Sequence, residues 1–141
     1  MSEILQLLAT RLAFLLEPGC FRIVHSESGS MGNAIVVLES ELMRVRISRD
    51  RSQLLSDIQF VASENQNWYG VHTVRSHVEG GRSTGLLDDG AIDFLRTNLT
   101  SIEQRVSTPD LLAGLEAQLI EIQEQWARER WGDYKSPGPQ S

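Results

Sequence analysis

Apolar residues recur at helical spacing over the first seventeen positions of the chain. The stripe consists of Ile4, Leu8, Leu12 and Leu15, and Leu5, Leu7 and Leu16 broaden it. Steps of three and four residues place these side chains on one side of a helix, and Pro18-Gly19 ends the pattern. We therefore predict a first helix from Ser2 to Glu17.

Beyond this helix the pattern changes to short apolar runs that are separated by polar turns. The turns read SESGSMGN, ESE and SRDRS, which is typical of an antiparallel meander. Four strands are predicted, near residues 20–27, 33–39, 42–48 and 53–60.

Helical spacing returns after a polar loop over residues 62–67. Trp68, Val71, Val74 and Val78 lie three or four residues apart and are followed by two glycines. This spacing, with glycine at its end, predicts a short middle helix rather than a strand.

The C-terminal part shows two more helical stripes. The first consists of Ile92, Leu95, Leu99, Ile102 and Val106, and the second of Leu112, Leu115, Leu119, Ile122 and Trp126. Asp88 or Asp89 can cap the first helix. Thr108 can cap the second, with Pro109 in its first position, and Gly132 ends it. Because the connection between them is short, we expect an antiparallel helical hairpin.

Together these elements predict an α+β fold: a four-stranded antiparallel meander with an N-terminal helix, a short middle helix and a C-terminal helical hairpin. A chain of 141 residues has the usual size of one domain. We assign residues 1–132 to that domain. Residues 133–141 are polar and carry no stripe, so we expect them to form a disordered tail.

Pairing the strands about their turns sorts their residues onto two faces. The core face holds Ile23, Val36, Leu38, Met43, Val45, Ile47, Leu54, Ile58 and Phe60, with Ile23, Leu38, Met43 and Ile58 level with one another. The opposite face holds Arg22, Val24, Ile35, Val37, Arg44, Arg46, Leu55 and Asp57. This register places Arg22 beside Glu39 and Arg44 beside Asp57.

The second face mixes arginines with apolar side chains, and two interpretations of it stay open. In the first, the arginine stems lie over neighbouring valines, the guanidinium groups pair with Glu39 and Asp57, and one helix packs alongside. In the second, the face is a recognition surface with an apolar centre and arginines around it, which makes its eight residues our candidate partner-binding site. A solvated face rarely carries four apolar residues, so we expect a helix of this chain, a second copy or another protein to cover part of it.

Charge and cysteine content narrow the classes of function. The net charge is −6, from 13 basic and 19 acidic residues, which disfavours nucleic acid and anionic membranes as partners and favours a basic protein. The N-terminal stripe is interrupted by polar residues and has no signal-peptide features, so we expect no membrane span. The single cysteine, Cys20, excludes disulfides within the chain and thiolate zinc sites, which fits a cytoplasmic location. We expect its thiol to be buried and inert.

No residue pattern points to catalysis, to a cofactor or to a metal. The three histidines, His25, His72 and His77, show no ligand spacing, and neither a nucleophile motif nor a phosphate loop occurs. We therefore expect a non-enzymatic protein without a cofactor. An enzyme would require an unrecognised pocket, for example one that gathers His72, Glu79 and Asp88.

Several segments together resemble small bacterial proteins of the immunity type, which are found beside secreted polymorphic toxins. After the leucine-rich helix come GCFRIVHSE, VVLESELMRVRISRDRSQLLSDI and NWYGV, followed by two closing helices, so the likeness in layout spans residues 3–132. The resemblance implies an intracellular, non-enzymatic protein that binds and neutralises a cognate toxin domain. Opposite charge would steer this binding if the toxin is basic. A homo-oligomeric module and a small enzyme are the alternatives.

Overall fold

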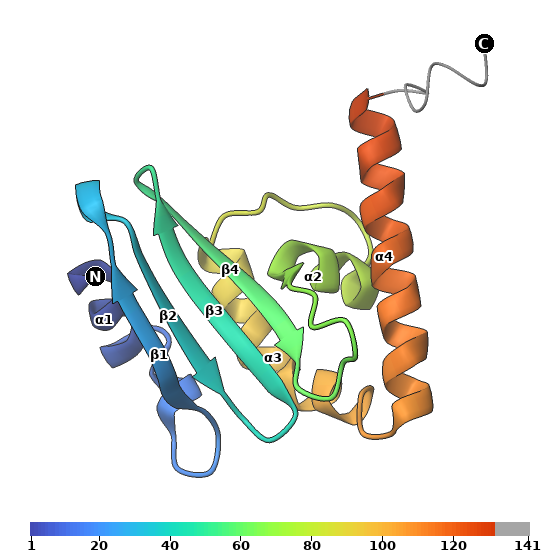
Figure 1. The fold of residues 1–141 in the computed structure, drawn as a ribbon, viewed down its shortest axis with the longest axis horizontal. Helices are drawn as coiled ribbons and strands as arrows, with labels where there is room; N and C mark the ends of the chain where they lie inside the picture. The colour runs from blue at the N-terminus through green and yellow to red at the C-terminus, as the bar shows by residue number, and fades with distance from the viewer. Residues whose placement is uncertain (132–141) are drawn as a thin grey trace.

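The computed structural model describes residues 1–131, with the backbone alone for Trp131. This part of the chain forms four α-helices and one antiparallel sheet of five strands (Figure 1). The helices are α1 (Ser2–Ala9), α2 (Val71–Glu79), α3 (Asp89–Gln104) and α4 (Pro109–Trp131), and the strands are β1 (Arg22–Ser28), β2 (Ala34–Glu39), β3 (Met43–Asp50), β4 (Gln53–Phe60) and β5 (Tyr69–Gly70); two short 3-10 helices, η1 (Ala13–Leu16) and η2 (Ser30–Gly32), flank β1. The predicted α+β class is confirmed, with five strands instead of four. Gly132 and the predicted tail over 133–141 lie outside the described residues.

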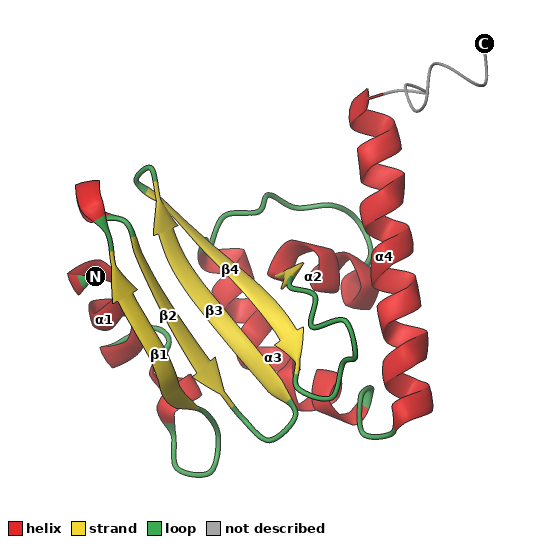
Figure 2. Cartoon of the chain, viewed as in Figure 1, coloured by secondary structure: helices red, strands yellow, loops and turns green. Residues whose placement is uncertain are grey.

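The sheet is a meander in which each strand pairs with the next, in the order β1-β2-β3-β4-β5. The fifth strand was not predicted: its two residues pair with β4, where the spacing alone places the start of a helix. Buried positions alternate along β2 and β3, so one face of the sheet lies in the core. Figures 1 and 2 show α1 and α3 behind this face, whereas no helix of the described chain lies in front of β1–β4.

The predicted core residues of the strands are buried with two exceptions, Ile23 and Leu54. Leu54 is half-buried. Ile23 is 44% exposed because it lies on β1, the outermost strand, where every residue is exposed. At this edge the position of the strand in the sheet, and not the alternation of apolar and polar residues, therefore determines which side chains are exposed.

The first helix is shorter than predicted. α1 ends at Ala9, and the chain continues through an irregular turn into η1. The Thr10 hydroxyl donates to the carbonyl of Gln6 at 2.7 Å, and the backbone of Thr10 leaves the helical region, with φ −126° and ψ −95°. The four residues of the central stripe are nevertheless all buried, so the pattern identified the buried side although the helix breaks.

The predicted helix caps are confirmed, but the predicted helical hairpin is not a packed pair. The Asp88 carboxylate accepts from the amide of Ala91 at 2.9 Å, and the Thr108 hydroxyl accepts from the amide of Leu111 at 3.2 Å. The short middle helix forms as α2 and ends at Gly80, whose φ is 80°. This helix lies between α3 and α4, and α4 contacts chiefly α2 (Figure 1). The middle helix thus takes the place of a direct contact between the last two helices.

The predicted register holds for the first two pairs of β1 and β2, up to a bulge after Ile23, but not between the following strands. Arg22 lies opposite Glu39, as predicted. It is Arg46, however, and not Arg44, that lies opposite Asp57. The prediction that Arg44 pairs with Asp57 is therefore wrong by two residues, although a shift of two leaves each side chain on its predicted face.

The register is shifted by two residues both between β2 and β3 and between β3 and β4, because each of these two turns is centred one residue later than predicted. Between β3 and β4, Arg51 and Ser52 take positive φ angles of 52° and 68°, as in a tight type I′ hairpin, which glycine or asparagine ordinarily marks in a sequence. Between β2 and β3, the Ser40 amide donates to the Met43 carbonyl at 2.8 Å, so that Leu42 belongs to the turn. Neither turn carries the residues that would have fixed its centre.

Candidate protein-binding face

The candidate partner-binding residues lie on the sheet face that points away from the core, toward the viewer in Figure 1. Strand pairing arranges this face in three rows across β1–β4: Arg22-Glu39-Arg44-Gln59, His25-Val37-Arg46-Asp57 and Glu27-Ile35-Ser48-Leu55. We call these twelve residues the outer face. Seven of the eight predicted residues belong to it, and the apolar ones, Ile35, Val37 and Leu55, are half-buried.

Val24 is the predicted residue outside these rows. A β-bulge interrupts the pairing of β1 between Ile23 and His25, so His25 lies opposite Val37 in place of Val24. Val24 itself is 43% exposed at the edge of the sheet. The prediction is corrected to His25, because strict alternation along a strand cannot anticipate an inserted residue.

Arg44 is the centre of the first row. Its Nε donates to Glu39 Oε2 at 2.7 Å, and one Nη donates to Gln59 Oε1 at 2.7 Å and to Gln66 Oε1 at 2.9 Å. Arg22 approaches Glu39 at 3.6 Å. The hydrogen bond from Arg44, with the charges of both arginines, holds the pKa of Glu39 below its usual value although burial opposes this shift.

Arg46 is the centre of the second row. Its Nε and one Nη donate to Asp57 Oδ2 at 3.2 and 3.1 Å, and its guanidinium carbon lies 4.3 Å from the ring centre of Trp68. Only 30% of the Arg46 side chain and 22% of the Asp57 side chain are exposed. A carboxylate and an aromatic ring together hold this arginine in one orientation.

The loop between β4 and β5 covers part of the outer face through Gln66 and through Trp68, which the spacing had assigned to the middle helix. The backbone carbonyl of Gln66 accepts from Gln59 Nε2 at 2.7 Å, and Trp68 stacks on Arg46. Arginines pair with Glu39 and Asp57 as expected, although Arg46 and not Arg44 is the partner of Asp57. Of the three covers considered, a covering helix of this chain is not found among the described residues, and this loop covers part of the face instead (Figure 1). Its sequence, ASENQN, has the composition of an ordinary solvent loop, so no local signal indicated the contact.

The third row borders a depression of about 500 Å³. Ile35 and Leu55 form its apolar part, and Glu27, Arg46 and Asp57 contribute polar groups. The outer face is therefore concave beside its apolar residues, and Arg46 and Asp57 at its border are paired with each other. Such a surface can accept a protruding apolar side chain of a partner.

The residues suggested for an enzyme pocket have separate partners. His72 stacks on Trp126 with ring centres 5.3 Å apart, Glu79 accepts from Arg75 at 3.0 Å, and Asp88 caps α3. Burial lowers the pKa of His72 below its usual value. None of these contacts joins two of the three residues.

Three further expectations concern thiol chemistry, metals and membranes. Cys20 is exposed, so the expectation of a buried thiol is wrong; it precedes the edge strand, outside the core. Within residues 1–131, no group of three or more His, Cys, Asp and Glu side chains is arranged to hold a metal ion. No helix in that part of the chain combines the length and the apolarity needed to cross a bilayer.

No protein-family model, curated protein or solved structure matches the chain. The likeness to immunity-type proteins thus rests on the sequence segments alone. The function has to be inferred from the geometry of the surfaces.

Proposed function

We propose that the protein is a non-enzymatic binding module whose outer face docks a folded partner protein, as an immunity protein docks the toxin domain that it neutralises. The observation that carries this proposal is the outer face itself, where half-buried Ile35 and Leu55 line a depression, half-buried Val37 lies in the neighbouring row, and no described helix covers them. Apolar side chains at the centre of a polar, arginine-containing surface are typical of protein interfaces.

The pairing of the arginines favours a protein partner over nucleic acid. Arg44 and Arg46 are already paired with Glu39 and Asp57, so they are not free to neutralise phosphates. Residues 22–60 contain five arginines and five acidic residues, so their charges cancel and the net charge of −6 comes from the rest of the chain. A neutral docking face on an acidic molecule suits a basic partner, which the surrounding field attracts while apolar contacts bind it.

The test compares one variant at the centre of the outer face with a matched control. Val37→Asp places a charge in the middle row, whereas Leu111→Asp makes the same kind of change on α4, where Leu111 is 49% exposed. We expect the parent chain and Leu111→Asp to capture a partner protein from the native cell. Val37→Asp should not capture it. Calorimetry with this purified partner should show binding to Val37→Asp weakened by about tenfold or more. A partner that binds both folded variants equally would remove the outer face as the docking site.

The immunity function has a separate readout. The captured partner, expressed alone in a bacterial host, should arrest growth. Co-expression of the parent chain should restore growth, and co-expression of Val37→Asp should not. A partner that is harmless when expressed alone would contradict the immunity role and leave the docking face in place.

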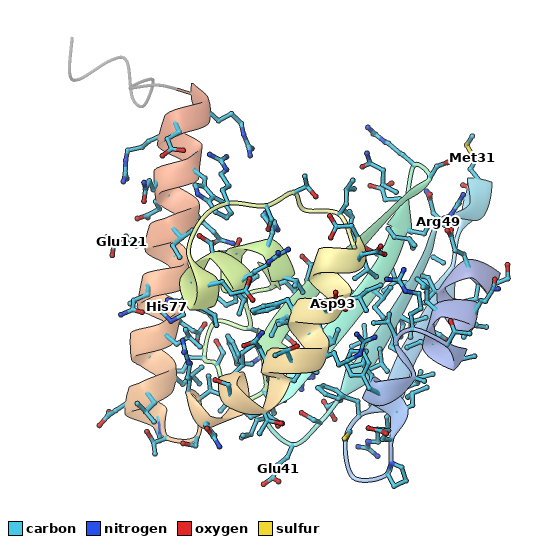
Figure 3. All side chains as sticks on the ribbon, turned by 180° about the vertical axis from the view of Figure 1, so that it is seen from behind. Met31, Glu41, Arg49, His77, Asp93 and Glu121 are labelled. Atoms are coloured by element: carbon cyan, nitrogen blue, oxygen red, sulfur yellow. The ribbon has the colours of Figure 1, made fainter. Side chains whose placement is uncertain are left out.

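A second candidate, a homo-oligomer, rests on the edge strand β1. Every residue of β1 is exposed. Within residues 1–130, five of the seven exposed large apolar side chains belong to the first 31 residues, namely Leu5, Leu16, Ile23, Val24 and Met31. Met31 points away from the rest of the molecule (Figure 3). An open strand edge can pair with a second copy, but the bulge and the charges of Arg22 and Glu27 disfavour regular pairing. Light scattering over a range of concentrations decides: a dimer that Ile23→Lys abolishes supports this candidate, and a monomer throughout removes it.

A further inference from the structure

A groove beside α4 has the features of a second binding site. It lies between the loop that follows β4 and the N-terminal half of α4, and its volume of about 550 Å³ falls in the range of small-molecule sites. Its apolar wall consists of Leu42, Val106, Pro109, Leu112, Ala113 and Ile120. The groove shares no lining residue with the depression of the outer face.

A buried carboxylate belongs to the lining of this groove. Glu116 of α4 is only 8% exposed. Its Oε2 accepts from the hydroxyl of Tyr69 at 2.5 Å and from that of Ser63 at 3.0 Å. Its Oε1 accepts no hydrogen bond from the described residues. Among these residues, His72 Nδ1 is the one side-chain polar atom that lacks both a hydrogen-bond partner and exposure to solvent, so Glu116 Oε1 is reached by solvent.

The charge of Glu116 has no counter-ion within residues 1–131. None of the ion pairs in this range includes it. The lining of the groove adds a second carboxylate, Glu64, and contains no arginine. Buried charges in proteins are ordinarily paired, because an uncompensated one is costly. The groove therefore combines apolar walls with a buried carboxylate that has no counter-ion among the described residues.

We propose that this groove binds a small organic ammonium ion with an apolar body. The ammonium group donates to Glu116 Oε1, and the apolar body lies against the wall near Leu112 and Ala113. An anion would meet two carboxylates and no cation. A metal ion is disfavoured, because no group of three or more His, Cys, Asp and Glu side chains within residues 1–131 is arranged to hold one. A primary alkylammonium ion satisfies both the charge and the walls.

Hexylamine and hexan-1-ol form a matched pair of probes for the test, because they differ in charge but not in chain length. Each is titrated into the full chain at neutral pH and followed by nitrogen–proton NMR correlation spectra. Hexylamine should shift the amide signals of the groove and bind about tenfold or more tightly than hexan-1-ol. No binding of hexylamine, or equal binding of the two probes, would overturn the proposal.

Glu116→Gln separates the charge from the shape of the site. The variant keeps the size of the side chain and an acceptor for Tyr69 and Ser63, so hexylamine should bind it about tenfold or more weakly while binding of hexan-1-ol stays unchanged. Unchanged hexylamine affinity would overturn the role of Glu116.

A second variant keeps the test decisive if Glu116→Gln fails to fold. Ala113→Leu changes an exposed position of α4 and fills part of the groove without altering its charge, so it should also weaken hexylamine binding. Retained affinity in this variant would exclude the groove as the site. Val37→Asp on the outer face is the control that should leave hexylamine binding unchanged, so the outcome is independent of the proposed docking function.

Discussion

The outer face and the groove beside α4 both hold charged side chains that are largely withdrawn from water, but they compensate these charges differently. On the outer face, Arg44 and Arg46 each donate to a carboxylate, at 2.7 and 3.1 Å. In the groove, Glu116 receives hydrogen bonds from two hydroxyl groups and no cation from the described residues. The two central arginines of the outer face are thus compensated within the free protein, whereas Glu116 has no cation among the described residues.

This difference indicates what each surface can recognise. A surface with paired charges gains little when it exchanges them for the charges of a partner, so its affinity must come from burying Ile35, Val37 and Leu55. A buried carboxylate without a cation gains when a ligand supplies one. The first surface therefore selects by shape and apolar contact, and the second selects by charge.

The largest expected effect tests the groove at alkaline pH. Burial, together with the hydrogen bond to Glu116, raises the pKa of Tyr69 from its ordinary value of 10.0 to about 12. The unfolded chain loses this proton first, so the free energy of unfolding is unaffected below pH 10 and falls as the pH rises through about 12. A difference of this size corresponds to a loss of about 3 kcal/mol. Chemical denaturation across this range measures that loss.

Tyr69→Phe is the control for this prediction, because it removes the titrating hydroxyl and keeps the ring beside Phe60. At neutral pH the variant should be less stable by about 1 to 3 kcal/mol, since Glu116 loses a hydrogen-bond donor. It should show no alkaline loss from this site. If parent and variant lose the same stability over the alkaline range, another group titrates there and the description of the Tyr69–Glu116 pair is wrong.

The next effect tests whether Arg46 of the outer face is compensated within the chain. Asp57→Asn removes the charge that compensates Arg46 and keeps the shape of the side chain, so the free energy of unfolding should fall by about 1 to 2 kcal/mol. Glu129→Gln is the exposed counterpart: Glu129 pairs with Arg82 at 2.7 Å, with about half of each side chain exposed, and its loss should cost less than about 0.5 kcal/mol. If denaturant titrations give the same loss of unfolding free energy for both variants, the outer face is an ordinary solvated surface and does not differ from the groove in the way described.

Sequence periodicity predicted most elements of the fold because each of them buries one side only. The caps at Asp88 and Thr108 were also predictable, since their hydrogen bonds reach only three residues along the chain. What escaped prediction has no local marker. The positive φ angles of Arg51 and Ser52 shift the register without glycine or asparagine, and the position of α2 between α3 and α4 depends on tertiary packing.

The two candidate sites also differ in how far the sequence predicted them. Seven of the eight residues predicted for the outer face belong to it, because a register error of two residues leaves the side chains of β2, β3 and β4 on their predicted face. The groove was not predicted, because Glu116 follows Leu115 at the border of an amphipathic stripe, where a polar residue attracts no notice. Its partners Ser63 and Tyr69 lie 53 and 47 residues away in the chain. Only the folded structure brings these groups together.

The smallest expected effect concerns the first row of the outer face. The hydrogen bond from Arg44 lowers the pKa of Glu39 in the folded state. The stability that this pair contributes is therefore present above the pKa of the unfolded chain and is lost as the pH falls through the lowered pKa. Arg44→Gln removes both the charge and the Nε donor, so the pKa of Glu39 should rise toward its ordinary value of 4.5. An NMR titration of the Glu39 carboxyl measures this change directly.

Arg22→Gln separates the hydrogen bond from the field of the neighbouring charges. Arg22 lies 3.6 Å from Glu39 and its side chain is 79% exposed, so water screens its charge and its removal should move the pKa of Glu39 less than Arg44→Gln does. If the two variants shift the pKa equally, the general field of the arginines is the cause. In that case Glu39 would be no better compensated than a carboxylate on any basic surface, and the outer face would lose the property that distinguishes it from the groove.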